Sequence, residues 1–455
     1  MTETEAAFEQ ATFSKIAWRL CPLLFAGYFV AFLDRVNVGF AKLQMASDLG
    51  LSDAVYGFGA GVFFIGYFLC EMPANLAMVR VGARRWIARI MLTWAVVSAA
   101  FLFTGHLRWG PVSHLLGLTD AEFSFYFLRF VLGVAEAGFV PGVLLYLTFW
   151  FPASRRAQVM ALFFVAIPLA SALGSPLSGA ILQFMDGAEG LRGWQWLFLV
   201  EALPSLLVGF LVLAKLPDGP REARWLSDDE RALVERRLAE DDAARQVHRQ
   251  SHALRHVFTD WRVWAAGLAD FSRGVYANAL NYWLPTIVQE IGIPKKDYFL
   301  VGLVSMIPWG IGAVAMVVVA WSSDRSGERR WHAIGSSLVA AIGCVLLAFA
   351  GHSAVVSVLA LAMIAAGGLA WLAVFWTLPT AFLSGVAAAA GIGWINAISQ
   401  LGGFVGPDML GRLRGTGQGD NTLAFLILAA VALVVTVLTY ALSRTPRPLL
   451  QSPAP

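Results

Sequence analysis

The chain is short of charged residues. Only 14% of its 455 residues are Asp, Glu, Lys or Arg, and 58% are hydrophobic, whereas a soluble globular protein is usually about 25% charged. This shortage excludes a water-soluble protein of this size, because too few polar side chains exist to cover its surface. The net charge is only +3, and no interleaved basic and aromatic patch indicates nucleic-acid binding.

The motifs of common enzymes and pumps are also missing. No Gly-rich phosphate loop ends in Lys-Ser/Thr, which disfavours an ATP-driven pump, and neither His-Glu-x-x-His nor Gly-x-Ser-x-Gly occurs. We therefore expect neither an enzyme nor a cofactor. The three cysteines, Cys21, Cys70 and Cys344, fall within apolar runs and are expected to pack rather than to form disulfides or bind metal.

What the sequence does contain is a series of long apolar runs. Each has about 20 residues, the length of a helix that crosses a bilayer, and only helices satisfy the backbone of such a run within lipid. We predict an all-α integral membrane protein with twelve transmembrane helices. Their expected ranges are 15–40, 55–78, 86–106, 122–146, 157–183, 196–216, 264–290, 299–321, 332–350, 354–378, 382–411 and 422–442.

A basic loop occurs twice. Arg-Val-Gly-Ala-Arg-Arg-Trp at 80–86 returns as Arg-Ser-Gly-Glu-Arg-Arg-Trp at 325–331, each between two apolar runs. This repeat predicts two pseudo-symmetric six-helix bundles, residues 1–216 and 262–455, an organisation that many secondary transporters use. We expect a gating role for the two loops, which comprise Arg80, Gly82, Arg84 and Arg85 in the first copy and Asp324, Arg325, Gly327, Arg329 and Arg330 in the second.

The polar stretch 217–261 separates the halves. A capping box at Ser227 and Glu230 predicts a charged, amphipathic helix from about 228 to 243 in a cytoplasmic linker. His248, His252 and His256 would share one helix face. We predict no metal site there, because neither Cys nor carboxylate completes a ligand set.

Lysine and arginine predict the orientation in the membrane. They are concentrated before the first run, in the two repeated loops, around Arg155 and Arg156, and after the last run. With alternating helices, all of these ends lie on one side, which we expect to be the cytoplasm. The prediction is a multi-pass protein of a bacterial-type inner membrane with both termini cytoplasmic.

Charges inside the predicted spans are the strongest functional signal. Span 1 carries Asp34 and Arg35, and span 4 carries Arg129 and Glu136. A charge at the centre of a membrane helix costs about 2.5–3.5 kcal/mol on insertion scales and needs a partner or a wet cavity. We predict that the two arginines hold an anionic substrate while Asp34 and Glu136 exchange protons. The structural alternative is salt bridges that lock the two spans together.

Several segments resemble the major facilitator superfamily and, within it, the anion:cation symporter family of organic-anion transporters. They are Leu33–Ala41, Phe64–Asn75, Leu128–Gly142, Gly193–Glu201, Trp283–Thr286, Gly391–Asn396 and Gly402–Pro407, together with the two basic loops. The resemblance implies the major facilitator fold and symport of a carboxylate with protons or another cation. It assigns the family's charged pairs to the four residues above, and its polar substrate contact in span 11 to Asn396.

The chain also departs from the family pattern. Val79 stands where the first loop usually has Asp, and Phe32 replaces a frequent Tyr. Span 7 carries unusual polar residues, and Asp408 follows Pro407 where an aromatic residue is more common. We predict substrate contacts at Asn281 and Trp376 and possible selectivity roles for Asn278, Asp270, Arg273 and Asp408.

The predicted function is therefore import of a small organic carboxylate (a dicarboxylate, sugar acid or aromatic acid) by proton symport and alternating access. The expected partners are the organic anion, the proton or another cation, and membrane lipid, and the protein is expected to be monomeric. Two alternatives remain open from the residues: an exporter or antiporter of organic anions, and a membrane sensor that binds an organic acid without moving it.

Overall fold

The computed structural model describes residues 3–248, 259–351, 353–383, 385–416 and 421–444. Helices follow the predicted apolar runs in order, and within the described residues no strand is present. Their bounds are α1 Glu3–Leu49, α2 Asp53–Val81, α3 Ala83–Ala100, η1 Phe101–Phe103, α4 Pro111–Leu115, α5 Asp120–Glu136, α6 Phe139–Thr148, α7 Ala153–Phe164, α8 Ala166–Phe184, η2 Ala188–Gly190, α9 Gly193–Lys215, η3 Pro220–Glu222, α10 Asp228–His248, α12 Trp261–Glu290, α13 Tyr298–Ser326, α14 Arg330–Ala348, α15 Ala354–Phe375, α16 Pro379–Phe382, α17 Gly385–Thr416 and α18 Thr422–Arg444.

Ten helical segments of the described chain are long and apolar enough to cross a membrane by length and composition. Two long helices that coincide with predicted spans, α12 and α17, are not among them. They carry the polar residues that the sequence singled out in the second half. Polar side chains in a membrane-spanning helix must be covered by neighbouring protein rather than by lipid. In this structure α12 and α17 pack against each other.

The predicted fourth span is not one continuous helix. It divides into α5 and α6 at Ala137 and Gly138, where Gly138 has φ 83°. A Cβ at this glycine would lie 2.5 Å from that of Ala74, so both the left-handed backbone and the close approach of α2 require glycine. The break places Glu136 at the last residue of α5.

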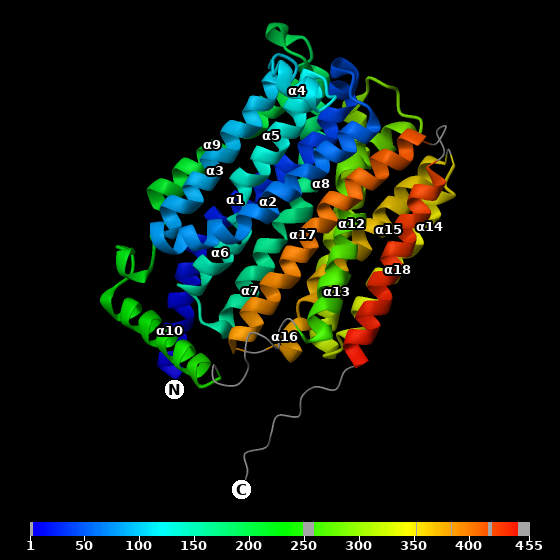
Figure 1. Ribbon diagram of the computed structural model, residues 1–455. Coiled ribbons are helices and arrows are strands. Elements are labelled where there is room, and N and C mark those ends of the chain that lie inside the picture. Colours follow the sequence, from blue (N-terminus) through cyan, green and yellow to red (C-terminus); the bar gives the residue numbers. More distant parts are fainter. Residues whose placement is uncertain (1–2, 249–258, 352, 384, 417–420, 445–455) are drawn as a thin grey trace.

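The helices form one bundle with two ends (Figure 1). The linker helix α10, the start of α1 and the end of α18 lie at one end, which we call the linker side, and α4 lies at the opposite end, the far side. The halves meet through α1 with α12, α2 with α17, and α8 with α13. These pairs place each half's helices directly against the other's.

Glycines allow the halves to approach closely on the far side. A Cβ on Gly179 of α8 would lie 2.3 Å from the carbonyl oxygen of Tyr298, and one on Gly302 of α13 would lie 2.4 Å from that of Ser175. Gly57 of α2 approaches the Pro407 carbonyl of α17 in the same way. The far side is therefore packed shut between the halves in this structure.

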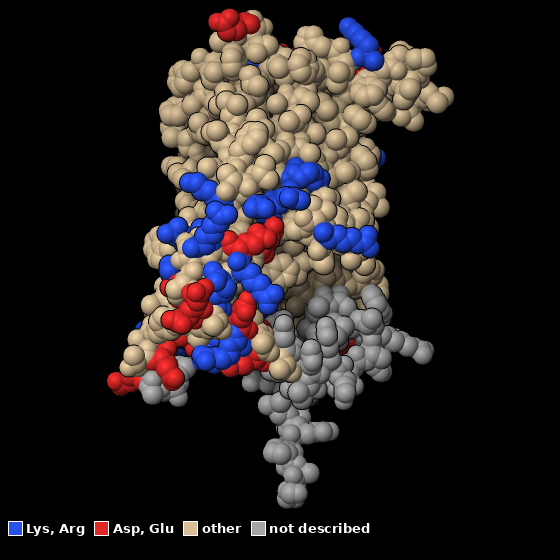
Figure 2. Space-filling model, turned by 90° about the vertical axis from the view of Figure 1, so that its left-hand side faces the viewer, with Lys and Arg blue, Asp and Glu red and all other residues tan. Residues whose placement is uncertain are grey.

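The linker docks on the N-terminal half. The predicted capping box forms at Ser227 and Glu230, and Glu230 also pairs with Lys15 of α1 at 2.7 Å. Farther along α10, Arg237 pairs with Glu9 at 2.5 Å and Asp241 with Arg156 at 3.6 Å. Figure 2 shows this face of the molecule, with Lys, Arg, Asp and Glu gathered mainly on its lower half.

Candidate substrate site

The charged residues of the first half pair across helices. Arg35 of α1 donates from Nη2 to Oε1 of Glu136 at the end of α5. The Glu136 side chain is 4% exposed and that of Arg35 13%. The sequence predicted both residues at the site, and the structure brings them together as a buried ion pair.

Aromatic rings surround the Arg35 guanidinium. Its central carbon lies 5.0 Å from the ring centre of Phe32, 5.4 Å from that of Phe63 and 5.6 Å from that of Tyr67. Such rings attract a cation through their quadrupole while excluding water. The Nε of Arg35 is buried without a hydrogen-bond partner, an unsatisfied donor of the kind that needs an explanation at a binding site.

Asp34 faces a different part of the first half. Its carboxylate accepts hydrogen bonds from Trp94 Nε1 at 3.1 Å, Ser98 Oγ at 3.3 Å and Ser205 Oγ at 2.8 Å. These donors belong to α3 and α9, so Asp34 is not part of the Arg35–Glu136 pair. A second buried carboxylate, Glu201 of α9, lies in the same region and accepts from Ser178 at 2.7 Å.

Arg129 donates hydrogen bonds mainly to backbone carbonyls. Its Nε donates to Gly59 O at 3.3 Å and its Nη2 to Ala60 O at 2.9 Å, both on α2. Nη2 also contacts the hydroxyl of Tyr282 in the second half at 3.2 Å. The residue is fully buried, and Nη1 has no partner. Arg129 thus joins α2, α5 and α12 and does not pair with Glu136 on its own helix segment.

The second half holds an acid–base pair within one helix. Arg273 donates from Nε to Oδ1 of Asp270 at 2.7 Å, three residues earlier on α12. Their side chains are 17% and 3% exposed. Tyr28 of α1 lies within electrostatic range of Arg35, Glu136 and Arg273.

Polar contacts also link α2 and α17. Asn396, the predicted substrate contact, donates to Glu71 Oε1 at 2.7 Å, and the other oxygen of Glu71 is buried without a partner. Sequence reasoning quoted the segment containing Glu71 but gave this acid no role. Its signal was available, since it is a carboxylate inside a predicted span.

The other predicted contacts lie on α12 and α15. Asn278 donates to the Gly274 carbonyl at 2.9 Å, and Asn281 is 8% exposed where its backbone meets Gly39 of α1. Trp376, at the end of α15, packs edge-on against Phe375 at 5.2 Å. Of the three, Asn281 thus lies where the two halves meet.

Asp408 lies apart from this group. It accepts both of its hydrogen bonds from Nε of Arg412, at 2.9 Å, toward the far side of α17. Sequence reasoning also missed an ionic cluster at that end, which we call the far-side lock: Lys42, Asp53, Glu290 and Arg414. Asp53 pairs with Lys42 at 2.8 Å and with Arg414 at 3.4 Å, and Arg414 pairs with Glu290. The lock joins α1 and α2 to α12 and α17.

The two basic loops use different acids. In the first loop, Gly82 has φ 96°, and Asp218 of the linker accepts from the Arg84 backbone N–H at 2.7 Å and lies 3.9 Å from its side chain. In the second, Gly327 has φ 67° and Arg329 pairs with Asp324 of α13. Asp218 thus supplies a carboxylate to the loop that lacks one at Val79. Arg80, Arg85 and Arg325 are exposed. Arg325 lies over the ring of Trp321 and Arg330 over that of Trp331.

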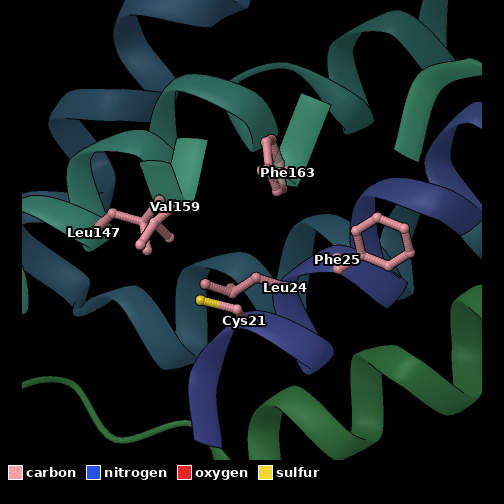
Figure 3. Close-up of a pocket in the computed structure, with 6 residues that line it drawn as sticks. All are labelled: Cys21, Leu24, Phe25, Leu147, Val159 and Phe163. Carbon is pink, nitrogen blue, oxygen red and sulfur yellow. The ribbon is translucent and has the colours of Figure 1, made fainter. Parts of the chain in front are cut away.

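A small pocket between α1, α6 and α7 does not belong to the charged site (Figure 3). Apolar side chains and the Cys21 thiol line it, so it offers no charge for an anion. Among the described residues no group of His, Cys, Asp or Glu is suited to a metal ion. His252, His256 and the His248 side chain lie outside the described part.

Comparison with known proteins shows which family has this sequence and fold. The model of the Major Facilitator Superfamily matches residues 24–407. A putative tartrate transporter of Agrobacterium vitis is 45% identical over 96% of this chain and 92% of its own length. A quinolone resistance transporter of Acinetobacter baumannii is 39% identical over 95% and 96%. The crystal structure of a D-xylose-proton symporter aligns with TM-score 0.73 at 16% identity, over 94% of this chain and 98% of the other.

These findings confirm the predicted fold and the resemblance. The relatives are named transporters over almost their entire lengths, so the protein is a membrane transporter and not an enzyme. The chain belongs to the Major Facilitator Superfamily.

Proposed function

We propose that the protein imports a small organic carboxylate together with protons by alternating access. The observation that carries this proposal is the buried ion pair of Arg35 and Glu136 between α1 and α5. An arginine stays charged and can bind a carboxylate through two parallel N–H bonds. Its present partner is a group that can take up a proton.

Substrate and proton binding are linked through this pair. When Glu136 binds a proton, it no longer neutralises Arg35, and the guanidinium becomes available to a substrate anion. When the proton leaves, Glu136 competes with the anion for the same arginine. Asp34 is proposed as a second proton-exchanging residue that acts through α1, because its hydrogen-bond partners lie on α3 and α9.

The proposed orientation follows the positive-inside rule. The linker side carries the two basic loops and is taken as the cytoplasm of a bacterial cell, with the protein in the inner membrane and acting as a monomer. With the far side packed shut, the structure is not open to the far side. The name of the Agrobacterium vitis relative supports an organic acid such as tartrate as the substrate.

Uptake of labelled tartrate into proteoliposomes tests the proposal. With acid outside, the wild type should accumulate tartrate, whereas Glu136→Gln should equilibrate or exchange it without accumulation. Glu235→Gln is the matched control, since Glu235 forms an exposed ion pair with Arg221 in the linker. Undiminished proton-driven accumulation by Glu136→Gln contradicts the coupling role. A wild type that moves none of a panel of carboxylates contradicts the proposed substrate class.

Export is the second candidate, favoured by the quinolone resistance transporter among the relatives. An exporter driven by proton antiport would accumulate substrate in the same vesicles only when the proton gradient is reversed. The direction of the gradient that drives accumulation therefore separates the two candidates.

A further inference from the structure

We infer that Arg273 is a second anion-binding group and that the preferred substrate carries two carboxylates, one held by Arg35 and the other by Arg273. This inference rests on the proposed function and narrows its substrate class. It assigns one carboxylate-binding arginine to each half of the transporter.

The register of α1 and α12 brings the two arginines to neighbouring levels. A Cβ on Gly39 of α1 would lie 3.1 Å from the Tyr282 carbonyl of α12, and both helices run from the linker side to the far side. Arg35 precedes Gly39 by four residues, so it lies level with residue 278 of α12. That level is five residues from Arg273, toward the far side. At 1.5 Å per residue the offset is ~7.5 Å along the helices, which two arginine side chains and a short dicarboxylate can span.

Tyr28 provides an electrostatic link between the charged pairs of the two halves. The same register places it level with residue 271, and it lies within electrostatic range of Arg35, Glu136 and Arg273. One residue of the first half is therefore close to the charged pairs of both halves.

Exposure separates these two arginines from the third. The side chains of Arg35 and Arg273 are 13% and 17% exposed, whereas Arg129 is fully buried against α2 carbonyls. Arg273 has five N–H donors and its Nε is bonded to Asp270. Its terminal amino groups supply the geometry for a carboxylate while Asp270 holds the side chain in place.

Asp270 then acts as a positioning residue. An i, i+3 pair on one helix persists when helices move against each other, so Arg273 stays oriented through the transport cycle. In the proposed complex the substrate itself would join α1 and α12, with one carboxylate on the arginine of each helix.

Competition in wild-type proteoliposomes tests the inference without any substitution. Labelled tartrate uptake is measured against succinate, malate and the monomethyl ester of succinate. Succinate should compete on the order of 30-fold better than its monoester, the factor expected for one additional charge-assisted contact. Equal competition by the two compounds overturns the inference but leaves carboxylate transport intact. If no carboxylate is transported or competes, the proposed function itself fails.

Substitution of Arg273 supplies the second test. Arg273→Gln should raise the tartrate concentration for half-maximal uptake on the order of 30-fold and change that for a monocarboxylate such as glycerate less than about threefold. Arg262→Gln is the control, because it removes another arginine that pairs with an aspartate on the same helix. Parallel losses for both substrates show a merely structural role and overturn the assignment. Should Arg273→Gln fail to fold, Arg273→Lys keeps the charge but loses the two-point geometry, and it should still reduce the preference for the dicarboxylate.

Discussion

The two halves hold their intramembrane charges in different ways. In the first half, Arg35 and Glu136 come from two helices, whereas in the second, Arg273 and Asp270 come from one. A pair between helices can be separated by their movement, or released when the acid is protonated. A pair within a helix remains together. The difference suggests that the first half couples the proton to transport and that the second half selects the substrate.

The largest expected loss of uptake comes from breaking the ion pair of the first half. Arg35→Gln leaves Glu136 buried without its cation, a loss that costs about 3–5 kcal/mol in other buried pairs, and it removes the substrate clamp. Tartrate uptake should fall more than ~100-fold. Uptake and thermal unfolding are measured together, with Arg192→Gln as the control because that arginine forms an exposed pair with Asp48. Near-normal uptake by Arg35→Gln would contradict the central position of this pair.

A substitution that disturbs the close packing of the far side should reduce uptake less. Gly302→Ala places a Cβ 2.4 Å from the Ser175 carbonyl, whereas Gly310→Ala on the same helix enters open space. Gly302→Ala should force α8 and α13 apart and slow uptake by roughly tenfold. Gly310→Ala should leave uptake intact and raise stability by about 0.5–1 kcal/mol, the usual gain in helix propensity. Equal behaviour of the two variants would show that this contact does not limit closure.

The two basic loops allow a direct energetic comparison. Asp218 accepts a backbone N–H at the start of α3, a helix without a side-chain cap of its own. Asp324 pairs with Arg329 while 68% exposed. Asp218→Ala should cost about 1–2 kcal/mol, as expected for a lost helix cap, and Asp324→Ala about 0–1 kcal/mol. Thermal unfolding in detergent measures the loss of stability in both variants. A larger loss for Asp324→Ala than for Asp218→Ala would contradict the idea that Asp218 takes the place of the acid missing at Val79.

The smallest expected effect lies in the linker. Burial opposes ionisation of Glu230, but hydrogen bonding and the charge of Lys15 outweigh it and hold the pKa below the ordinary value of 4.5. A lowered folded-state pKa stabilises the docked linker above about pH 4.5, and this contribution is lost as the pH falls toward the lowered pKa. Glu230→Gln should cost less than about 1 kcal/mol at pH 7, and its difference from the wild type should shrink on acidification. A difference that is independent of pH would show that the ion pair contributes nothing.

The sequence predicted the fold well because its signals are local. Long apolar runs predict membrane helices without knowledge of their neighbours, and the repeated loop indicates the duplication. The division of span 4 was missed because Gly138 looks like any small residue until α2 is placed against it. The extent of α1, from Glu3 to Leu49, was missed because polar ends of a membrane helix resemble loops.

The sequence singled out the charged residues of the candidate site but not their contacts. Asp34 and Arg35 are neighbours in sequence, yet successive residues on a helix point about 100° apart. One therefore faces α3 and α9 while the other faces Glu136. The contacts of Arg129 with backbone carbonyls of α2 were not predicted, because such partners leave no sequence signal. Asp218 lies 134 residues along the chain from the backbone N–H that donates to it. A contact over such a sequence separation is visible only in the folded structure.

The division of roles between the halves is tested most directly by two variants in one assay. Proton-driven accumulation, and the ratio of succinate to monoester competition during exchange, are measured for Glu136→Gln and Arg273→Gln in matched proteoliposomes. Glu136→Gln should lose accumulation and keep the ratio, and Arg273→Gln should lose the ratio and keep accumulation of a monocarboxylate. If either variant loses both properties to the same degree, coupling and selection are not divided between the halves.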